Sequence, residues 1–300
     1  MQQYDVVIVG GGPGGLSAAL ALGRARRRVL LCDGGAPRNA PTAAAHNFFT
    51  RDGTPPLQLL QIGRAQLEPY TSVEFEAVTV EEATRHDTGF TLQFSGGRQV
   101  TARKLILATG IRDELPAIPG FQELWGKSIA HCPYCHGWEV RDQPLAIYGN
   151  GDDGFELVRL LRGWSHDLVL CTNGPADLSG DQRIRLETKG IPIREEPIVA
   201  LEGAQGQLET IVFADGSRLA RHAIFMRPRQ YQRSHLPQRL GCTLTSNGLV
   251  QVDLTGRTEI PGLYVVGDAA QRAQSIGMAV SSGSLAAGML NHELAAEDFG

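Results

Sequence analysis

The chain has 300 residues, of which 42% are hydrophobic and 20% charged, and its net charge is −4. This composition is typical of folded proteins and excludes a disordered or coiled-coil chain, while the length predicts about two domains. The negative charge argues against a nucleic-acid partner. The sequence suggests neither a signal peptide nor a membrane-spanning stretch, so we expect a cytoplasmic protein without membrane association. The 36 glycines are 12% of the 300 residues, against about 7% in an average protein. This surplus predicts tight turns or close approach of the backbone to a ligand.

The first predicted elements are a strand, a glycine-rich loop and a helix. Val6–Val9 is a β-branched run typical of a strand buried on both faces, and Leu16–Leu22 continues after the loop at helical spacing. The loop between them fits G-x-G-x-x-G, which binds a dinucleotide pyrophosphate through backbone N–H groups and the helix N-terminus. The glycines that we assign to this site are Gly10, Gly12, Gly14 and Gly15.

Three later segments support this interpretation over the alternative of an ordinary glycine turn in an α/β domain. Val29–Asp33 predicts a second strand, and Asp33 lies 23 residues after the first loop glycine, close to the spacing of a ribose-binding carboxylate. Lys104–Gly110 predicts another buried strand, with Thr109 and Gly110 at its exit. The segment 258–268 repeats the pattern of an apolar strand followed by Gly267 and Asp268.

A second copy of the unit follows in the middle of the chain. Leu145–Tyr148 predicts a strand, Phe155–Leu161 a helix and Asp167–Thr172 a further strand that ends, again, 23 residues after the first loop glycine. The loop residues of this second candidate nucleotide site are Gly149, Gly151, Asp152, Asp153 and Gly154. Two units at equal spacing predict two dinucleotide-binding domains.

The two copies differ where the nucleotide would be recognised. Thr172 stands where the first unit has Asp33, and residues 173–177 contain no Arg or Lys for a 2′-phosphate. Asp152 and Asp153 also place negative charge at the expected phosphate position. We therefore do not expect NADPH there: the second site holds another adenine dinucleotide, such as a second FAD, holds nothing, or is a structural vestige.

The most reactive motif lies just before the second loop. Cys132 and Cys135 form C-x-x-C with Pro133 inside, which predicts two sulfurs on the first turn of a helix, close enough for a disulfide and biased towards thiolate. A redox disulfide is the interpretation we favour over zinc binding, c-type haem attachment or a pair of inert buried thiols, and we expect no metal. The remaining cysteines, predicted to be buried structural thiols, are Cys32, Cys171 and Cys242.

Together these motifs resemble the low-molecular-weight thioredoxin reductase family over essentially the whole chain. The resemblance implies an α/β fold of two Rossmann-like domains, the second inserted in the first, and a homodimer. The expected FAD-binding domain is residues 1–115 and 238–300. The expected second domain is residues 121–226, joined by linkers at 116–120 and 227–237.

The resemblance also implies roles for individual residues. Cys135 would lie nearest the flavin, able to form a charge-transfer pair with its C4a position, and Cys132 would attack the external substrate. Asn47 would lie beside the flavin, and Asp268 would bind the ribityl or pyrophosphate part of FAD. A helix starting at about Ser275 would direct its N-terminus at the flavin pyrimidine ring. The cofactor residues expected there are Gln274, Ser275 and Ile276.

One position departs from the usual family pattern. His136 follows the second cysteine, where the reductases usually have an Asp that carries the proton, and a histidine is a better proton acceptor near neutral pH. The string from Cys132 to Glu139, CPYCHGWE, is more similar to the branch that includes gliotoxin-type dithiol oxidases and members independent of pyridine nucleotides, one group of which is diflavin-linked.

We therefore expect an FAD-dependent enzyme that exchanges two electrons between flavin, the Cys132–Cys135 disulfide and an external dithiol or disulfide, not driven by NADPH. The substrate would be a small molecule or a thioredoxin-like protein. The alternatives are an NADPH-dependent thioredoxin reductase, a non-thiol FAD monooxygenase or reductase, and a nucleotide-binding sensor without turnover.

Overall fold

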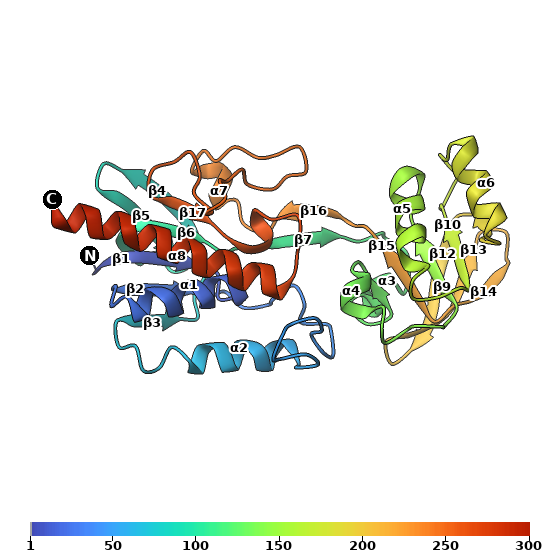
Figure 1. Ribbon diagram of the computed structural model, residues 1–300, viewed down its shortest axis with the longest axis horizontal. Helices are drawn as coiled ribbons and strands as arrows, with labels where there is room; N and C mark the ends of the chain where they lie inside the picture. Colours follow the sequence, from blue (N-terminus) through green and yellow to red (C-terminus); the bar gives the residue numbers. More distant parts are fainter. Residues whose placement is uncertain (1) are drawn as a thin grey trace. The chain divides into compact units, whose positions relative to one another are not determined.

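A computed structural model describes residues 2–300 (Figure 1). The chain forms two compact units, one built on a mixed β-sheet and the other on a parallel β-sheet, each with helices. Unit 1 comprises the chain up to Arg38, Phe48–Arg112 and Gln230–Gly300, and unit 2 comprises Asn39–Asn47 and Asp113–Arg229. The predicted α/β class with Rossmann-like domains is confirmed. No helix among residues 2–300 is long and apolar enough to cross a membrane.

The sheet of unit 1 has seven strands in the order β3-β2-β1-β6-β5-β4, with β17 paired to the second half of β6. The strands are β1 (Gln2–Val9), β2 (Val29–Cys32), β3 (Val73–Glu76), β4 (Val80–His86), β5 (Gly89–Phe94), β6 (Gln99–Leu107) and β17 (Leu263–Val265). All neighbours are parallel except along β6-β5-β4. The carboxyl ends of β1, β2, β6 and β17 therefore meet at one edge.

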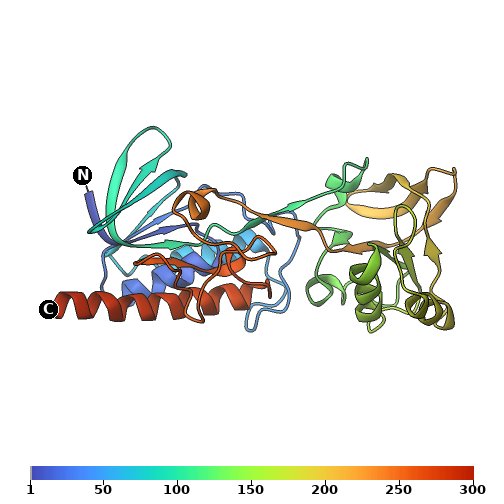
Figure 2. The same ribbon diagram turned by 90° about the horizontal axis from the view of Figure 1, so that it is seen from above.

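The helices of unit 1 are α1 (Pro13–Arg24), α2 (Pro56–Ala65), α7 (Leu236–Arg239) and α8 (Ile276–Phe299), the last a continuous rod in Figure 2, and a 3-10 turn, η1, covers Gly267–Ala269. Alternate residues of β1 lie in different core clusters: Val7 packs on one face of the sheet, whereas Val6 and Ile8 pack with α1 and α8 on the other. This confirms the predicted strand buried on both faces. α1 and α8 approach closely, because a Cβ on Gly283 would lie 2.0 Å from the carbonyl oxygen of Gly14.

Unit 2 has a five-stranded parallel sheet in the order β11-β10-β9-β15-β8 and an antiparallel sheet in the order β12-β13-β14. The strands are β8 (Ile129–Ala130), β9 (Leu145–Tyr148), β10 (Leu168–Cys171), β11 (Ile193–Arg194), β12 (Ile198–Ala204), β13 (Gln207–Phe213), β14 (Arg218–Ala220) and β15 (Ala223–Met226). The helices are α3 (Phe121–Leu124), α4 (Pro133–His136), α5 (Gly151–Leu161) and α6 (Gly180–Thr188). The predicted strand, loop, helix and strand of the second copy correspond to β9, α5 and β10.

The joints between the units differ from the linkers expected at 116–120 and 227–237. A two-stranded ribbon, β7 (Ile111–Glu114) with β16 (Arg229–Gln232), carries the chain between units. Ile118, expected in a linker, packs on the core of unit 2, and Leu236 is buried in unit 1, because both side chains are apolar. Residues 39–47, expected in the FAD domain, belong with unit 2.

Candidate active site

The first glycine loop leads from β1 into α1 in a conformation that only glycine allows at two positions. Gly10 has φ of 113°, and a Cβ there would lie 2.2 Å from the carbonyl oxygen of Ala108. A Cβ on Gly15 would lie 1.9 Å from the carbonyl oxygen of Gly10, so this glycine lets the helix pack on the loop. Gly12, by contrast, faces open space and begins α1 without a side-chain cap. The backbone N–H groups at the start of α1 are thus open to a ligand.

Gly14, also assigned to this loop, packs against α8. A Cβ at this position would lie 3.2 Å from the carbonyl oxygen of Ala279. Its visible role in the structure is therefore to bring two helices together.

Asp33 follows β2 and lines a pocket of about 300 Å³. Its Oδ2 accepts a hydrogen bond from Nη2 of Arg64 at 2.6 Å, and the Arg64 guanidinium lies over the Phe75 ring, 4.6 Å from its centroid. Nε of Arg64 is buried without a partner. The residues that line the pocket are Asp33, Gly34, Gly35, Arg64, Phe75, Ala77, Val78, Thr79 and Ser95. Sequence reasoning missed Arg64, which lies on a helix 31 residues after Asp33.

Three further predicted cofactor-binding residues follow the carboxyl ends of β6 and β17. The Thr109 hydroxyl is buried without a hydrogen-bond partner, and Gly110 has φ of 67° with open space at the Cβ position. Gly267 has φ of 69° and donates its N–H to the Ser282 hydroxyl at 3.0 Å. The structure therefore brings these positions to the same sheet edge as the glycine loop.

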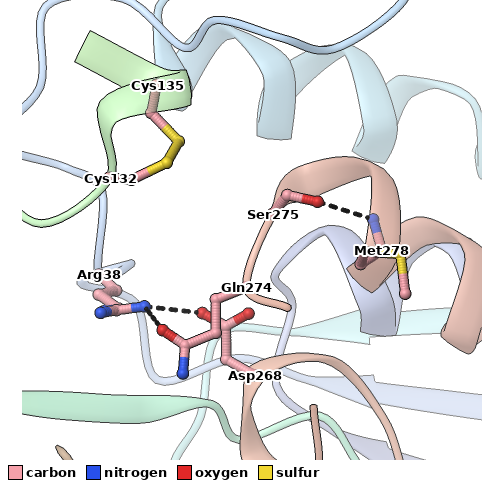
Figure 3. Close-up of a disulfide and its surroundings, with 7 residues drawn as sticks. All are labelled: Arg38, Cys132, Cys135, Asp268, Gln274, Ser275 and Met278. Atoms are coloured by element: carbon pink, nitrogen blue, oxygen red, sulfur yellow. Dashed lines mark hydrogen bonds and ion pairs between the residues drawn. A yellow bond between two sulfur atoms is a disulfide. The ribbon is translucent and has the colours of Figure 1, made fainter. Parts of the chain in front are cut away.

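Arg38 joins two of the late residues. Its Nη1 donates to Oδ2 of Asp268 at 3.1 Å and to Oε1 of Gln274 at 2.7 Å (Figure 3). Ser275 caps α8 by accepting the N–H of Met278 at 3.1 Å, and Ile276 is the first residue of that helix. The predicted helix start at about Ser275 is thus confirmed.

Asn47 lies at the end of the segment that belongs with unit 2. It has φ of 59°, a left-handed conformation that Asn tolerates better than most residues. Its expected place beside the flavin stays a prediction.

The C-x-x-C motif forms the disulfide that its spacing predicts. Cys132 caps the N-terminus of α4 in an extended conformation, Pro133 is the first helical residue, and Cys135 lies within the turn (Figure 3). The two Cα atoms are 5.3 Å apart, within the ordinary range for a disulfide. The backbone N–H groups of Cys135 and His136 both donate to the carbonyl of Cys132, which holds the turn closed.

His136 ends α4, and neither of its buried ring nitrogens has a hydrogen-bond partner. Burial lowers the pKa of His136 from its ordinary value, an effect that Glu139 opposes and His46 reinforces. A neutral imidazole beside a disulfide can accept a proton from an arriving thiol.

The other three cysteines are buried, as predicted. Burial raises the pKa of Cys32, Cys171 and Cys242 to about 12 each, so these thiols stay protonated. Among residues 2–300 no group of three or more His, Cys, Asp or Glu side chains could hold a metal ion.

The second glycine loop is tied to its own neighbours. Gly149 and Gly154 approach each other as Gly10 and Gly15 do, with a Cβ on Gly149 only 3.2 Å from the Cα of Gly154. Asn150 Oδ1 accepts the backbone N–H of Gly151 and of Asp177, each at 2.8 Å, and its Nδ2 donates to the Pro175 carbonyl at 2.9 Å. The loop after β10 is therefore fastened to the start of α5.

The polar side chains around this second loop are also engaged. Asp152 accepts from Gln182 at 2.8 Å, and Asp153 pairs with Arg227 at 2.8 Å. The Thr172 hydroxyl donates to the carbonyl of Gly174 at 2.6 Å. Arg183, which comes late after this strand in the sequence, reaches the loop from α6: it donates to the Ala176 carbonyl at 2.8 Å and also pairs with Glu195.

Comparison with known proteins identifies the class. Residues 4–283 match the family model described as pyridine nucleotide-disulphide oxidoreductase, and the chain belongs to this family. A probable thioredoxin reductase of Arthroderma benhamiae is 33% identical over 98% of this chain and 81% of its own length.

Solved structures point the same way. HlmI is 42% identical, with a TM-score of 0.94 over 99% of this chain and 94% of its own. TrxB of Bacillus anthracis, provisionally assigned as a thioredoxin reductase, is 37% identical, with a TM-score of 0.94 over 98% and 99%. The protein is thus an oxidoreductase enzyme with a thioredoxin-reductase-like fold.

The family binds FAD, and the residues of unit 1 fit this cofactor. The open face at Gly12 leaves backbone N–H groups for a pyrophosphate, and Asp33 borders a pocket beside the same sheet edge. The buried Thr109 hydroxyl lacks a partner that a ligand atom would supply. These residues, with Asp268 and the start of α8, would hold the cofactor.

Proposed function

We propose that the protein is an FAD-dependent thiol–disulfide oxidoreductase that takes two electrons from an external dithiol and does not use NADPH as its electron donor. The observation that carries this proposal is the Cys132–Cys135 disulfide on α4 with the unpaired ring of His136 beside it. Structural disulfides rarely join residues three apart at the start of a helix, whereas redox pairs commonly do.

The thiol chemistry follows from these three side chains. A donor thiol gives its proton to His136, and the resulting thiolate attacks Sγ of Cys132, which breaks the disulfide and releases Cys135 as a thiolate. The second donor thiol then attacks the first donor sulfur of the mixed disulfide, the bond from that sulfur to Cys132 breaks, and the Cys132 sulfur takes up the proton that the second thiol gives up. The donor leaves as a disulfide, and both enzyme cysteines are reduced. Bound FAD supplies the acceptor for these two electrons.

The state of His136 suits this direction. Because burial lowers its pKa, the ring stays neutral near pH 7 and can accept the donor's proton. A carboxylate at the same position, with a reference pKa near 4, would accept that proton less readily. The substrate in this proposal is a small dithiol or the dithiol of a thioredoxin-like protein.

The second glycine loop supports the absence of NADPH as a donor. Thr172 follows β10 and donates into its own loop, and residues 173–177 carry no Arg or Lys for a 2′-phosphate. The start of α5 carries Asp152 and Asp153, whose charge opposes a phosphate, and the Asn150 side chain fastens the loop that a nucleotide ribose would contact. A second FAD at this site would meet the same carboxylates.

NADPH-dependent thioredoxin reduction is the second candidate function. Its specific support is Arg183, which reaches the loop after β10 and could turn to a 2′-phosphate if it left Glu195. The relatives named as thioredoxin reductases add to this support.

An anaerobic titration of the flavin absorbance with NADPH, NADH and dithiothreitol separates the two functions. We expect dithiothreitol to bleach the flavin and both pyridine nucleotides to leave it oxidised. Rapid bleaching by NADPH, with one FAD per chain, would overturn the proposal. More than one FAD per chain, measured after denaturation, would identify the occupant of the second loop.

A further inference from the structure

Glu139 lies three residues after His136, on the turn that follows α4. Its Oε1 is 3.4 Å from Nε2 of His46, which belongs to the Asn39–Asn47 segment of the same unit. The pair is half-exposed and joins parts of the chain 93 residues apart. It places one negative and one ionisable group next to the redox turn.

Glu139 lies on the same turn as His136 and has His46 at 3.4 Å; of the two, Glu139 favours the protonated form of His136 and His46 opposes it. Two other ionisable side chains near this turn have different contacts. Arg141 lies over the Trp138 ring at 4.0 Å, and the His131 ring lies against Trp125, 6.0 Å between centroids.

We propose that Glu139 and His46 are positioning residues that set the proton affinity of His136 during attack of the dithiol on the Cys132–Cys135 disulfide. This inference rests on the proposed function. In the attack, the S–H bond of the donor breaks, its proton moves to the His136 ring, a bond forms between the donor sulfur and Cys132, and the electron pair of the disulfide leaves on Cys135.

The two residues act with opposite sign. The Glu139 carboxylate stabilises the imidazolium form of His136, so its removal lowers the pKa of His136. Removal of His46 leaves the carboxylate without its partner, so the pKa of His136 rises. A residue that merely supported the fold would not produce opposite shifts.

The test follows reduction of the disulfide itself, with dithiothreitol as the probe. The holoenzyme is mixed anaerobically with dithiothreitol from pH 5 to pH 8, quenched with acid, and its free thiols are alkylated and counted by mass. For the wild type, Glu139→Gln and His46→Gln, the rate is divided by that of the same protein carrying His136→Gln. Because the ionisation of dithiothreitol affects both rates equally, their ratio reports the contribution of His136 at each pH.

This ratio should rise with pH as the His136 ring loses its proton. We expect the midpoint of that rise to lie at lower pH in Glu139→Gln and at higher pH in His46→Gln than in the wild type. At the wild-type midpoint half of the rings are already neutral, so Glu139→Gln gains at most about twofold, whereas His46→Gln loses rate. Glu139→Asp, which keeps the charge, should retain the wild-type midpoint. Glu202→Gln and His166→Gln are matched controls, because Glu202 pairs with Arg218 on the antiparallel sheet and His166 lies after α5.

Midpoints that coincide in all variants, or that move in the same direction, would overturn the inference and leave the proposed function standing. A wild-type disulfide that dithiothreitol does not reduce would overturn both. If His46→Gln fails to fold, as thermal melting would show, the comparison of Glu139→Gln with Glu139→Asp decides alone.

Discussion

At the scale of single residues, the two cysteines are close in space but have unequal environments. Cys132 caps α4, whereas Cys135 lies within the helical turn and donates its N–H to the Cys132 carbonyl. We predict that Cys132→Ser abolishes bleaching of the flavin by dithiothreitol, because no disulfide remains to accept electrons. Stopped-flow absorbance under anaerobic conditions measures this. Cys242→Ser, at a buried thiol outside the motif, is the control, and unchanged bleaching in Cys132→Ser would favour a flavoprotein that does not use thiols.

The His136 ring is the proton acceptor in the proposed reaction. We predict that His136→Gln slows reduction of the disulfide by roughly 100-fold near pH 7, the usual contribution of general-base catalysis. The rate should be restored in part as the pH rises, because the donor then ionises without help. A variant rate within about threefold of the wild type at pH 7 would contradict this role.

The same ring should also make stability depend on pH. The pKa of His136 in the folded protein is lower than the ordinary value of 6.5, so the unfolded chain binds the proton first as the pH falls. The neutral His136 ring therefore makes its full contribution to the stability of the fold above pH 6.5. This contribution is lost as the pH drops from 6.5 to the pKa of His136 in the folded protein. Urea unfolding should show a smaller loss of stability between pH 7.5 and pH 5.5 in His136→Gln than in the wild type. Equal losses of stability in the variant and the wild type would contradict this prediction.

Some functional residues could not be predicted from the sequence. Cys132, Cys135 and His136 follow from a local motif, because three-residue spacing on a helical turn fixes their proximity. Arg64 and the Glu139–His46 pair depend on contacts between segments 31 and 93 residues apart, which no periodicity encodes. Asp33 was found by its spacing from the loop, but its pairing with Arg64 was not.

At the scale of elements, β1, the glycine loop and α1 form a unit whose glycines have different tasks. We predict that Gly15→Ala destabilises the fold by about 1–3 kcal/mol, because its Cβ would strike the Gly10 carbonyl. Gly12→Ala faces open space and should keep the stability of the fold but weaken FAD binding. Urea unfolding and the FAD content of the purified protein measure the two effects. Equal stability of the two variants would contradict this division.

The elements that were predicted correctly are those with strong local signals. Leu145–Tyr148 forms β9 at the predicted bounds, since its buried apolar run ends at a glycine loop. The segment 258–268 forms a strand only at Leu263–Val265, because the turn at Pro261 and Gly262, where φ is 80°, precedes it. The ribbon of β7 and β16 was missed, because its strands pair across more than 100 residues and carry polar side chains.

At the scale of the whole molecule, α8 leaves apolar side chains uncovered. Phe299, Leu285 and Met278 are 95%, 47% and 43% exposed. We predict a homodimer in solution that buries part of this helix, measured by sedimentation as twice the chain mass. Leu285→Glu should favour the monomer, whereas Leu57→Glu on α2, also exposed, should not. A wild-type monomer at micromolar concentration would contradict the prediction.

The assignment of residues 39–47 to unit 2 has a consequence for engineering. The chain leaves unit 1 twice, once for this short segment and once for Asp113–Arg229. Unit 2 therefore consists of two separate segments and cannot be transferred as one continuous piece of sequence. A graft of the longer piece onto a related scaffold would lack His46 and would leave Glu139 without its partner. Chimeras within this family should therefore exchange both pieces together.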